Sequence, residues 1–191
     1  MSVLDRVKNI TEICGLLNKW RGVVVLCVLL TSSTAVSQTP DEYQVKAVFI
    51  YNFLHFVDWP PESLGAEGEP FVVGVVGKNV FGSSLAEVLK DEMVKGHPVI
   101  LKHGDNVSEI GKAHVLFVES SYVAGNAKQI QSLMDKPVLT IGETGDFMKF
   151  GLVKFFTKEG KIKLEINQEA AAHTGLVISS KLLRLADIYK E

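Results

Sequence analysis

FVVGVVG, residues 71–77, is the stretch that decides the fold. It is continuously apolar and rich in β-branched valine, a composition typical of a strand that is buried on both faces. SLAE, residues 84–87, follows with the pattern of a capping box, which predicts a helix that reaches about Lys90. A buried strand followed closely by a helix is the repeating unit of α/β folds with a parallel sheet.

The same alternation continues toward the C-terminus. HPVILK (97–102), AHVLFV (113–118) and PVLTI (137–141) predict three further strands, and an amphipathic helix is expected over residues 121–134. The resulting order, β-α-β-β-α-β, predicts a mainly parallel sheet with helices on both faces.

The last third of the chain changes pattern. LVKFFT (152–157) and KIKLEI (161–166) alternate partly and flank the short turn KEG, which predicts an antiparallel hairpin. We therefore expect an α/β fold, a three-layer α/β/α sandwich with a mainly parallel sheet and a C-terminal antiparallel hairpin. No internal repeat interrupts residues 38–191, so one domain is the economical prediction.

Two helices are predicted after the hairpin. Asn167 is placed to cap a short helix that Gly175 ends. Ser179 or Ser180 is placed to cap a final helix over KLLRLADIYK, residues 181–190.

Residues 1–37 have the organisation of a secretory signal peptide. A basic start precedes the apolar run VVVLCVLL (23–30), and small residues then lead to a cleavage site before Gln38. An uncleaved anchor is the alternative, but a membrane span needs roughly 20 apolar residues. Cys14 and Cys27 both lie in this leader, so the exported protein is expected to have neither a thiol nor a disulfide.

Composition and charge exclude several classes of protein. The chain is 47% apolar and 22% charged, which is a globular composition. Its net charge is −2, and loss of four basic and two acidic residues with the leader makes it −4, so no basic surface for nucleic acid is expected. The five histidines show no metal-ligand spacing, and no catalytic motif is present. We predict no enzyme activity, no cofactor and no metal.

A weak anion or small-ligand site is predicted at the carboxyl edge of the sheet. Gly77, Ser83 and Ser84 join a strand to a helix, the geometry that binds phosphate, and Ser120 follows the third strand. The glycine spacing fits neither a P-loop nor a dinucleotide-binding loop, so a tight turn with a capped helix is the simpler alternative.

AVFIYNFLHFVDWPP, residues 47–61, belongs to a predicted helix from Glu42 to Trp59 that Pro60 and Pro61 end. One arc of this helix is apolar and predicts the core face: Val45, Phe49, Ile50, Phe53, Leu54, Phe56 and Val57. The opposite arc mixes amphipathic aromatic and short polar residues: Val48, Tyr51, Asn52, His55, Asp58 and Trp59. That composition is favoured in protein interfaces, but a later element such as the C-terminal helix could equally cover this arc.

Four blocks of the sequence carry a resemblance to the YfiR family. They are YQVKAVFIYNFLHFVDWP (43–60), FVVGVVGKNVFG (71–82), HVLFVESS (114–121) and GLVKFFTKEGKIKLEINQEAAAHTGLVISSKLLRLA (151–186). The blocks occur in the family's order and span nearly all of residues 42–188. The last block is long and specific.

The resemblance implies a periplasmic α/β protein that dimerises and represses an inner-membrane diguanylate cyclase by binding its periplasmic sensing domain. An outer-membrane lipoprotein can sequester such repressors, and the output is control of cyclic di-GMP, biofilm and motility. This chain lacks the cysteine pairs that characterised members use as disulfides.

Two hypotheses follow. In the first, the protein is a regulatory partner of a membrane signalling enzyme, and Tyr51, His55 and Trp59 are partner or dimer contacts. In the second, it is a periplasmic module that senses a small ligand between residues 77–84 and 119–122.

Overall fold

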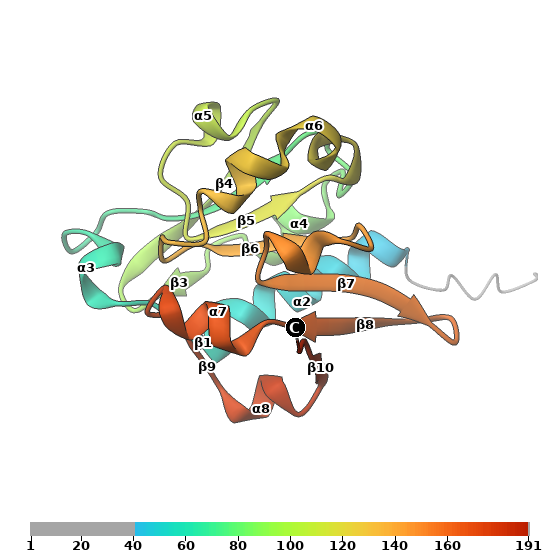
Figure 1. The fold of residues 1–191 in the computed structure, drawn as a ribbon. Helices are drawn as coiled ribbons and strands as arrows, with labels where there is room; N and C mark the ends of the chain where they lie inside the picture. Colours follow the sequence, from blue (N-terminus) through green and yellow to red (C-terminus); the bar gives the residue numbers. More distant parts are fainter. Residues whose placement is uncertain (1–40, 191) are drawn as a thin grey trace, which may run out of the picture. The chain divides into compact units, whose positions relative to one another are not determined.

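An eight-stranded sheet forms the centre of the computed structural model, which describes residues 41–190 (Figure 1). The predicted leader and both cysteines lie outside the described residues. The strands of this sheet are β2 (Phe71–Val76), β3 (Met93–Val94), β4 (His97–Gly104), β5 (Val115–Val118), β6 (Leu139–Gly142), β7 (Val153–Lys158), β8 (Lys161–Ile166) and β10 (Ala186–Ile188). Their order is β10-β8-β7-β6-β5-β2-β4-β3.

Most neighbouring strands in the sheet run parallel. β2 pairs in parallel with both β4 and β5, and β6 pairs in parallel with both β5 and β7. β7 and β8 form the predicted antiparallel hairpin, and β3 joins β4 at the other edge. All six residues of β2 are buried, as expected of a strand covered on both faces.

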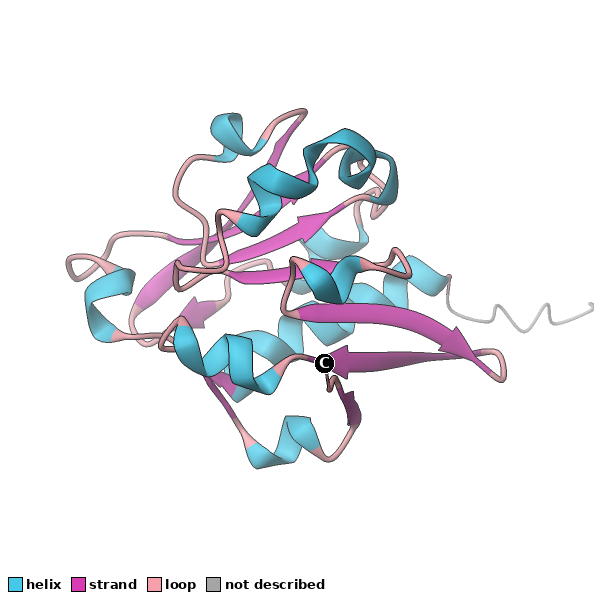
Figure 2. Cartoon of the chain, viewed as in Figure 1, coloured by secondary structure: helices cyan, strands magenta, loops and turns pink. Residues whose placement is uncertain are grey.

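Helices cover both faces of this sheet (Figure 2). They are α2 (Glu42–Phe56), α3 (Pro61–Leu64), α4 (Ser84–Val88), α5 (Val107–Ile110), α6 (Ser120–Gln131), η1 (Phe147–Lys149), α7 (Gln168–His173) and α8 (Ser180–Leu183). One apolar core lies on each face of the sheet, because alternate residues of a strand point to opposite faces. Val73 and Val75 pack with α2 and α4, whereas Val72 and Val76 pack with α5 and α6. The predicted three-layer α/β/α architecture is therefore confirmed.

The predicted C-terminal helix is correct at its start but wrong in its extent. Ser179 caps it as predicted, since its hydroxyl oxygen accepts from the N–H of Lys181 at 3.2 Å. α8 has four residues, and the chain then forms β10, which pairs in parallel with Leu164–Ile166 of β8. The backbone N–H of Tyr189 continues this pairing by donating to the carbonyl of Ile166 at 2.9 Å. The edge of β8 offers open backbone partners, and such tertiary pairing overrides the local helix propensity of residues 184–190.

The first helix is shorter than predicted. α2 ends at Phe56, because Val57 is extended (φ −119°, ψ 136°) and starts the two-residue strand β1 (Val57–Asp58). β1 pairs antiparallel with β9 (Val177–Ile178), and the N–H of Ser179 donates to the carbonyl of Phe56 at 2.8 Å. Helical geometry therefore does not apply to Trp59.

Helix starts agree with the sequence only in part. Asn167 caps α7 as predicted, since its side-chain oxygen accepts from the N–H of Ala170 at 2.9 Å. The predicted capping box of α4 is wrong, because Ser83 is the N-cap residue and makes no side-chain cap hydrogen bond. α6 covers most of its predicted range but has non-helical dihedral angles at Ala124 and Gly125.

Candidate functional site

The carboxyl edge of the sheet contains a topological switch point between β2 and β5. The chain leaves β2 toward β4 on one side, and it leaves β5 toward β6 on the other. Ligands of open α/β sheets bind in the crevice outside such a point. Gly77 follows β2 there with φ +96°, and a Cβ at this position would lie 3.0 Å from the Cβ of Glu119, so glycine permits the close approach.

Glu119 occupies the crevice from the end of β5. Its Oε1 accepts a hydrogen bond from the N–H of Ser121 at 3.1 Å, which caps α6, and Oε2 accepts from the Ser121 hydroxyl. Burial raises the pKa of the Glu119 carboxyl, but the hydrogen bonds from Ser121 and the charge of Lys78 together hold this pKa below its ordinary value. An ionised carboxylate therefore stands at the switch point.

The first turns of α2 fill the neighbouring space. Lys46 is only 3% exposed, and its ammonium pairs with Glu42 and with Glu143, which follows β6. The hydroxyl of Tyr43 donates to Oε2 of Glu143 at 3.2 Å, and its ring meets that of Phe81 edge-on at 5.4 Å. Burial, together with the charge of Glu143, raises the pKa of Tyr43 to about 12. The protein's own side chains thus close this edge.

The structure does not gather the four residues of the predicted anion site. Gly77 and Ser120 lie at the switch point, whereas Ser83 and Ser84 start α4. α4 packs in one core and α6 in the other, so their N-termini lie on opposite faces of the sheet. The carboxylate of Glu119 beside Gly77 also opposes a bound anion. The anion site stays a prediction.

Tyr51 and His55 do lie together, on the outer face of α2. Their rings meet edge-on with 4.7 Å between centroids and an interplanar angle of 68°. Nε2 of His55 is 3.9 Å from Oε2 of Glu92. Val48, which lies one turn before Tyr51 on α2, is 48% exposed. We call Val48, Tyr51, Asn52 and His55 the α2 outer face. The helix predicted over residues 181–190 does not form beyond Leu183. Val48 and His55 are exposed, whereas Tyr51 and Asn52 are half-buried.

Trp59 does not belong to the α2 outer face, which corrects its predicted position. It is 3% exposed, and its indole N–H donates to the carbonyl of His114 at 3.1 Å. Its ring meets Phe71 edge-on at 4.8 Å. Because α2 ends before it, Trp59 points into the core and is unavailable to a partner.

Two buried polar residues were not predicted from the sequence to be part of a site. Lys46 lies on the core face of α2 with Ile50 and Phe53, and this helical spacing is a signal that could have shown its burial. The second is His114, which is 1% exposed. Its Nδ1 accepts from the N–H of Val72 at 2.9 Å, and its Nε2–H donates to the carbonyl of Ser63 at 3.0 Å. His114 therefore has a structural role.

The geometry defines the class of protein: a doubly wound α/β domain whose carboxyl edge is filled by its own side chains and whose α2 outer face is partly exposed. Within residues 41–190, no three acidic, histidine or cysteine side chains are grouped to hold a metal ion. No helix in that range is long and apolar enough to cross a membrane.

The chain belongs to the YfiR/HmsC-like family, whose model matches residues 43–187. Proteins of this family are periplasmic and are known as repressors of diguanylate cyclases, so the family is regulatory and not catalytic. The family predicted from the four sequence blocks is thereby confirmed. Among curated proteins, no match to this chain is found.

Proposed function

We propose that this protein is exported to the periplasm, where it binds the sensing domain of an inner-membrane diguanylate cyclase and represses it. The family match over residues 43–187 is the observation that supports this function. Repression in the periplasm lowers cyclic di-GMP in the cytoplasm and thereby limits biofilm formation. We include in the proposal that the protein forms a homodimer and that an outer-membrane lipoprotein sequesters it.

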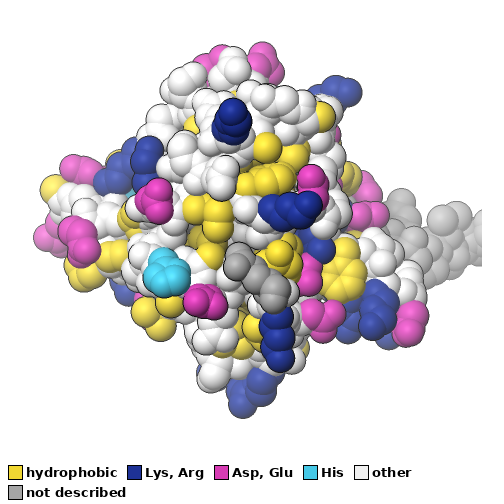
Figure 3. Space-filling model, viewed as in Figure 1, with side chains coloured by type: hydrophobic (Ala, Val, Ile, Leu, Met, Phe, Trp, Pro, Cys, Tyr) yellow, Lys and Arg dark blue, Asp and Glu magenta, His cyan; other side chains and the backbone are white. Residues whose placement is uncertain are grey.

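The α2 outer face is the surface that we propose for the cyclase. Val48 offers exposed apolar area, and Tyr51 and His55 offer amphipathic rings, the residue types that enrich interface cores. By contrast, the surface over α6 and α7 shows apolar side chains interrupted by charged ones (Figure 3).

The α2 outer face is also held rigidly. Ile50 and Phe53 on the inner side of the helix are fully buried, so the backbone of α2 is fixed before binding. The edge-on contact between Tyr51 and His55 restricts the rotamers of both side chains. A surface that is ordered in advance loses little conformational entropy when it binds, which favours affinity.

Charged groups lie beside the C-terminal end of the α2 outer face. Lys95 pairs with Asp58 at 2.7 Å, and Glu92 lies beside His55. A polar rim around an apolar centre is the usual anatomy of a protein interface. The ligand-sensor alternative at the carboxyl edge is less supported, because Lys46, Glu119 and Glu143 already occupy that edge.

The test uses a strain that lacks the gene and carries a cyclic di-GMP reporter. Deletion is expected to raise cyclic di-GMP, and the partner is the diguanylate cyclase whose additional deletion abolishes the rise. Wild-type protein is expected to restore the low level, whereas Val48→Asp is expected to fail, because loss of a central contact weakens binding by about 2 kcal/mol, or roughly 30-fold.

Gln131→Asp on α6 is the matched control, because it places the same charge on an exposed helix of the opposite layer. It is expected to restore repression at equal periplasmic protein levels. Unchanged cyclic di-GMP after deletion would contradict the repressor function. Full repression by Val48→Asp would remove the α2 outer face from the interface and leave the function standing.

A further inference from the structure

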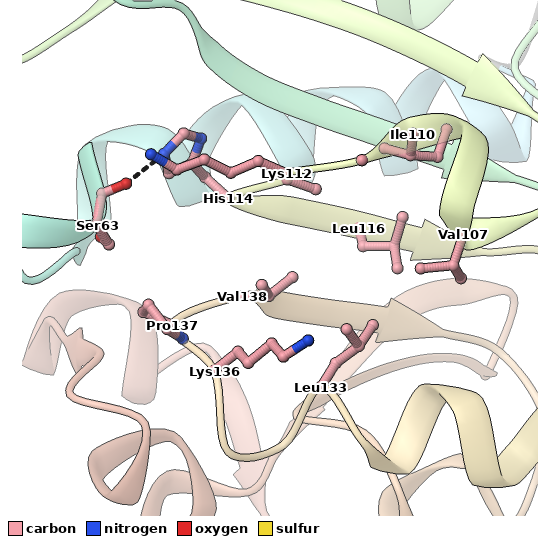
Figure 4. A pocket seen from close by; sticks show the side chains of 12 residues that line it. Ser63, Val107, Ile110, Lys112, His114, Leu116, Leu133, Lys136, Pro137 and Val138 are labelled. Carbon is pink, nitrogen blue, oxygen red and sulfur yellow. Dashed lines mark hydrogen bonds between the residues drawn. The ribbon is translucent and has the colours of Figure 1, made fainter. Parts of the chain in front are cut away.

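A cavity of about 430 Å³ opens at the amino edge of β5 and β6, at the opposite end of these strands from the switch point (Figure 4). Val107 and Ile110 of α5 form one wall, Leu116 of β5 forms the base, and Leu133 and Val138 form the other wall. Small-molecule sites commonly enclose about 300–1,000 Å³ and are mostly apolar. The size and lining suit a ring system or a short acyl chain.

The charged groups that line the cavity all have the same sign. Lys112 and Lys136 are its lining residues with charged side chains, and no carboxylate lines it. Neither lysine forms an ion pair with an acidic residue of the described range 41–190. In Figure 4 the ammonium of Lys136 points along the cavity toward Leu133. The ammonium of Lys112 lies beside Gly65, near the carboxylate of Glu69, so Lys136 provides the main positive charge. An apolar cavity with such an ammonium favours a ligand that carries a negative charge.

His114 forms a rigid and neutral part of the wall. Both ring nitrogens already have backbone partners, Val72 and Ser63, so neither is available to a ligand. Burial lowers the pKa of His114, and the charge of Lys112 lowers it further. The positive charge at this cavity therefore comes from the lysines and not from His114.

We propose that this cavity binds an amphipathic monoanion, with an aromatic or short aliphatic body between α5 and residues 133–138, and an acidic group on Lys136. Lys112 contributes less, because its ammonium lies near the carboxylate of Glu69. This site is independent of the proposed repressor function, because the cavity belongs to the core opposite α2.

The test compares two fluorescent probes with the same apolar body. 1-Anilinonaphthalene-8-sulfonate carries one negative charge, and N-phenyl-1-naphthylamine carries none. The proposal predicts saturable one-to-one binding of the sulfonate to the folded protein. Lys136→Met is expected to weaken sulfonate binding about tenfold, the loss of one charge-assisted contact, and to leave binding of the neutral probe unchanged. Lys128→Met is the matched control, because Lys128 is an exposed residue of α6 that does not line the cavity. This variant should bind both probes as wild type does.

Leu133→Trp is expected to fill the cavity and to abolish binding of both probes. If this variant does not fold, amide chemical shifts of wild-type protein replace it, and the sulfonate should shift the signals of Gly111 and Val138 most. The proposal is overturned if the sulfonate does not bind. It is equally overturned if Lys136→Met and Lys128→Met bind the sulfonate alike, or if the shifts or the residual binding in Leu133→Trp place it elsewhere.

Discussion

The two ends of β5 and β6 differ in how they meet the rest of the protein. At the carboxyl ends, Glu119 accepts a hydrogen bond from the N–H of Ser121, and Glu143 pairs with the buried ammonium of Lys46. At the amino ends, His114 and Val138 border an apolar cavity rimmed by lysines. The carboxyl edge is filled by side chains whose charges are hydrogen-bonded or paired, whereas the amino edge has a cavity with lysines that form no ion pair within residues 41–190.

This difference shows that position in a fold does not by itself define a binding site. The carboxyl edge of a doubly wound sheet is where ligands generally bind. Here the first helix of the domain extends over that edge, and Tyr43 and Lys46 occupy the space. α2 thereby has two functions in our account: its inner side seals the sheet, and its outer face contacts the cyclase.

The strongest test of the closed edge is Lys46→Met. Removing the ammonium leaves Glu143 buried without a cation, which we expect to lower the free energy of unfolding by about 3–5 kcal/mol. Urea denaturation at pH 7 measures this change. The double variant Lys46→Met/Glu143→Gln should recover much of the loss, and Lys128→Met should show none. A loss below about 1 kcal/mol would mean that the ion pair does not hold the edge closed.

The amino edge is tested by the pH dependence of His114. Its pKa is lowered in the folded state, so between this pKa and the unfolded value of about 6.5 only the unfolded chain binds the proton. Stability contributed by neutral His114 is therefore complete above about pH 6.5 and decreases as the pH falls, by at most about 1.4 kcal/mol per pH unit.

Urea denaturation at several pH values between 7.5 and 5 measures the slope. His114→Gln cannot titrate and should show a flatter profile than wild type, although its stability at pH 7.5 is lower. Equal slopes in the two proteins would show that His114 accepts a proton in the folded state, contrary to its two hydrogen bonds.

A smaller effect is expected from Glu119→Ala at the carboxyl edge. Loss of the cap on α6 should cost about 1 kcal/mol at pH 7. Because the folded pKa of Glu119 is lowered, its contribution is present above the unfolded pKa of about 4.3 and is lost as the pH falls through the folded value. Thermal unfolding curves of variant and wild type should therefore converge in acid. A constant difference at all pH values would assign the effect to packing instead.

The sequence predicted the parallel sheet well, because buried strands such as 71–77 are continuous and apolar and their periodicity is local information. The C-terminal segment was missed for the opposite reason. KLLRLADIYK has good helix formers, but the edge of β8 lies far away in sequence and determines its structure. β1 and β9 were missed likewise, since two-residue strands have no pattern of their own.

The candidate site was predictable only where helical geometry held. Tyr51 and His55 are four residues apart on α2 and share its outer arc as predicted, and their rings are in contact. Trp59 follows the end of α2, so its predicted direction was wrong. The amino-edge cavity could not be predicted, because the segments that line it, 107–116 and 133–138, become neighbours only through the pairing of β5 with β6.

The most direct test of the central claim is site-specific photo-crosslinking in cells. A benzophenone amino acid at position 48 on the α2 outer face should form a covalent adduct with the epitope-tagged diguanylate cyclase that the genetic test identifies. The same amino acid at position 131, on the opposite layer, should form none. An adduct from position 131 but not from position 48, at equal protein levels, would contradict the account and place the cyclase on the other face of the molecule.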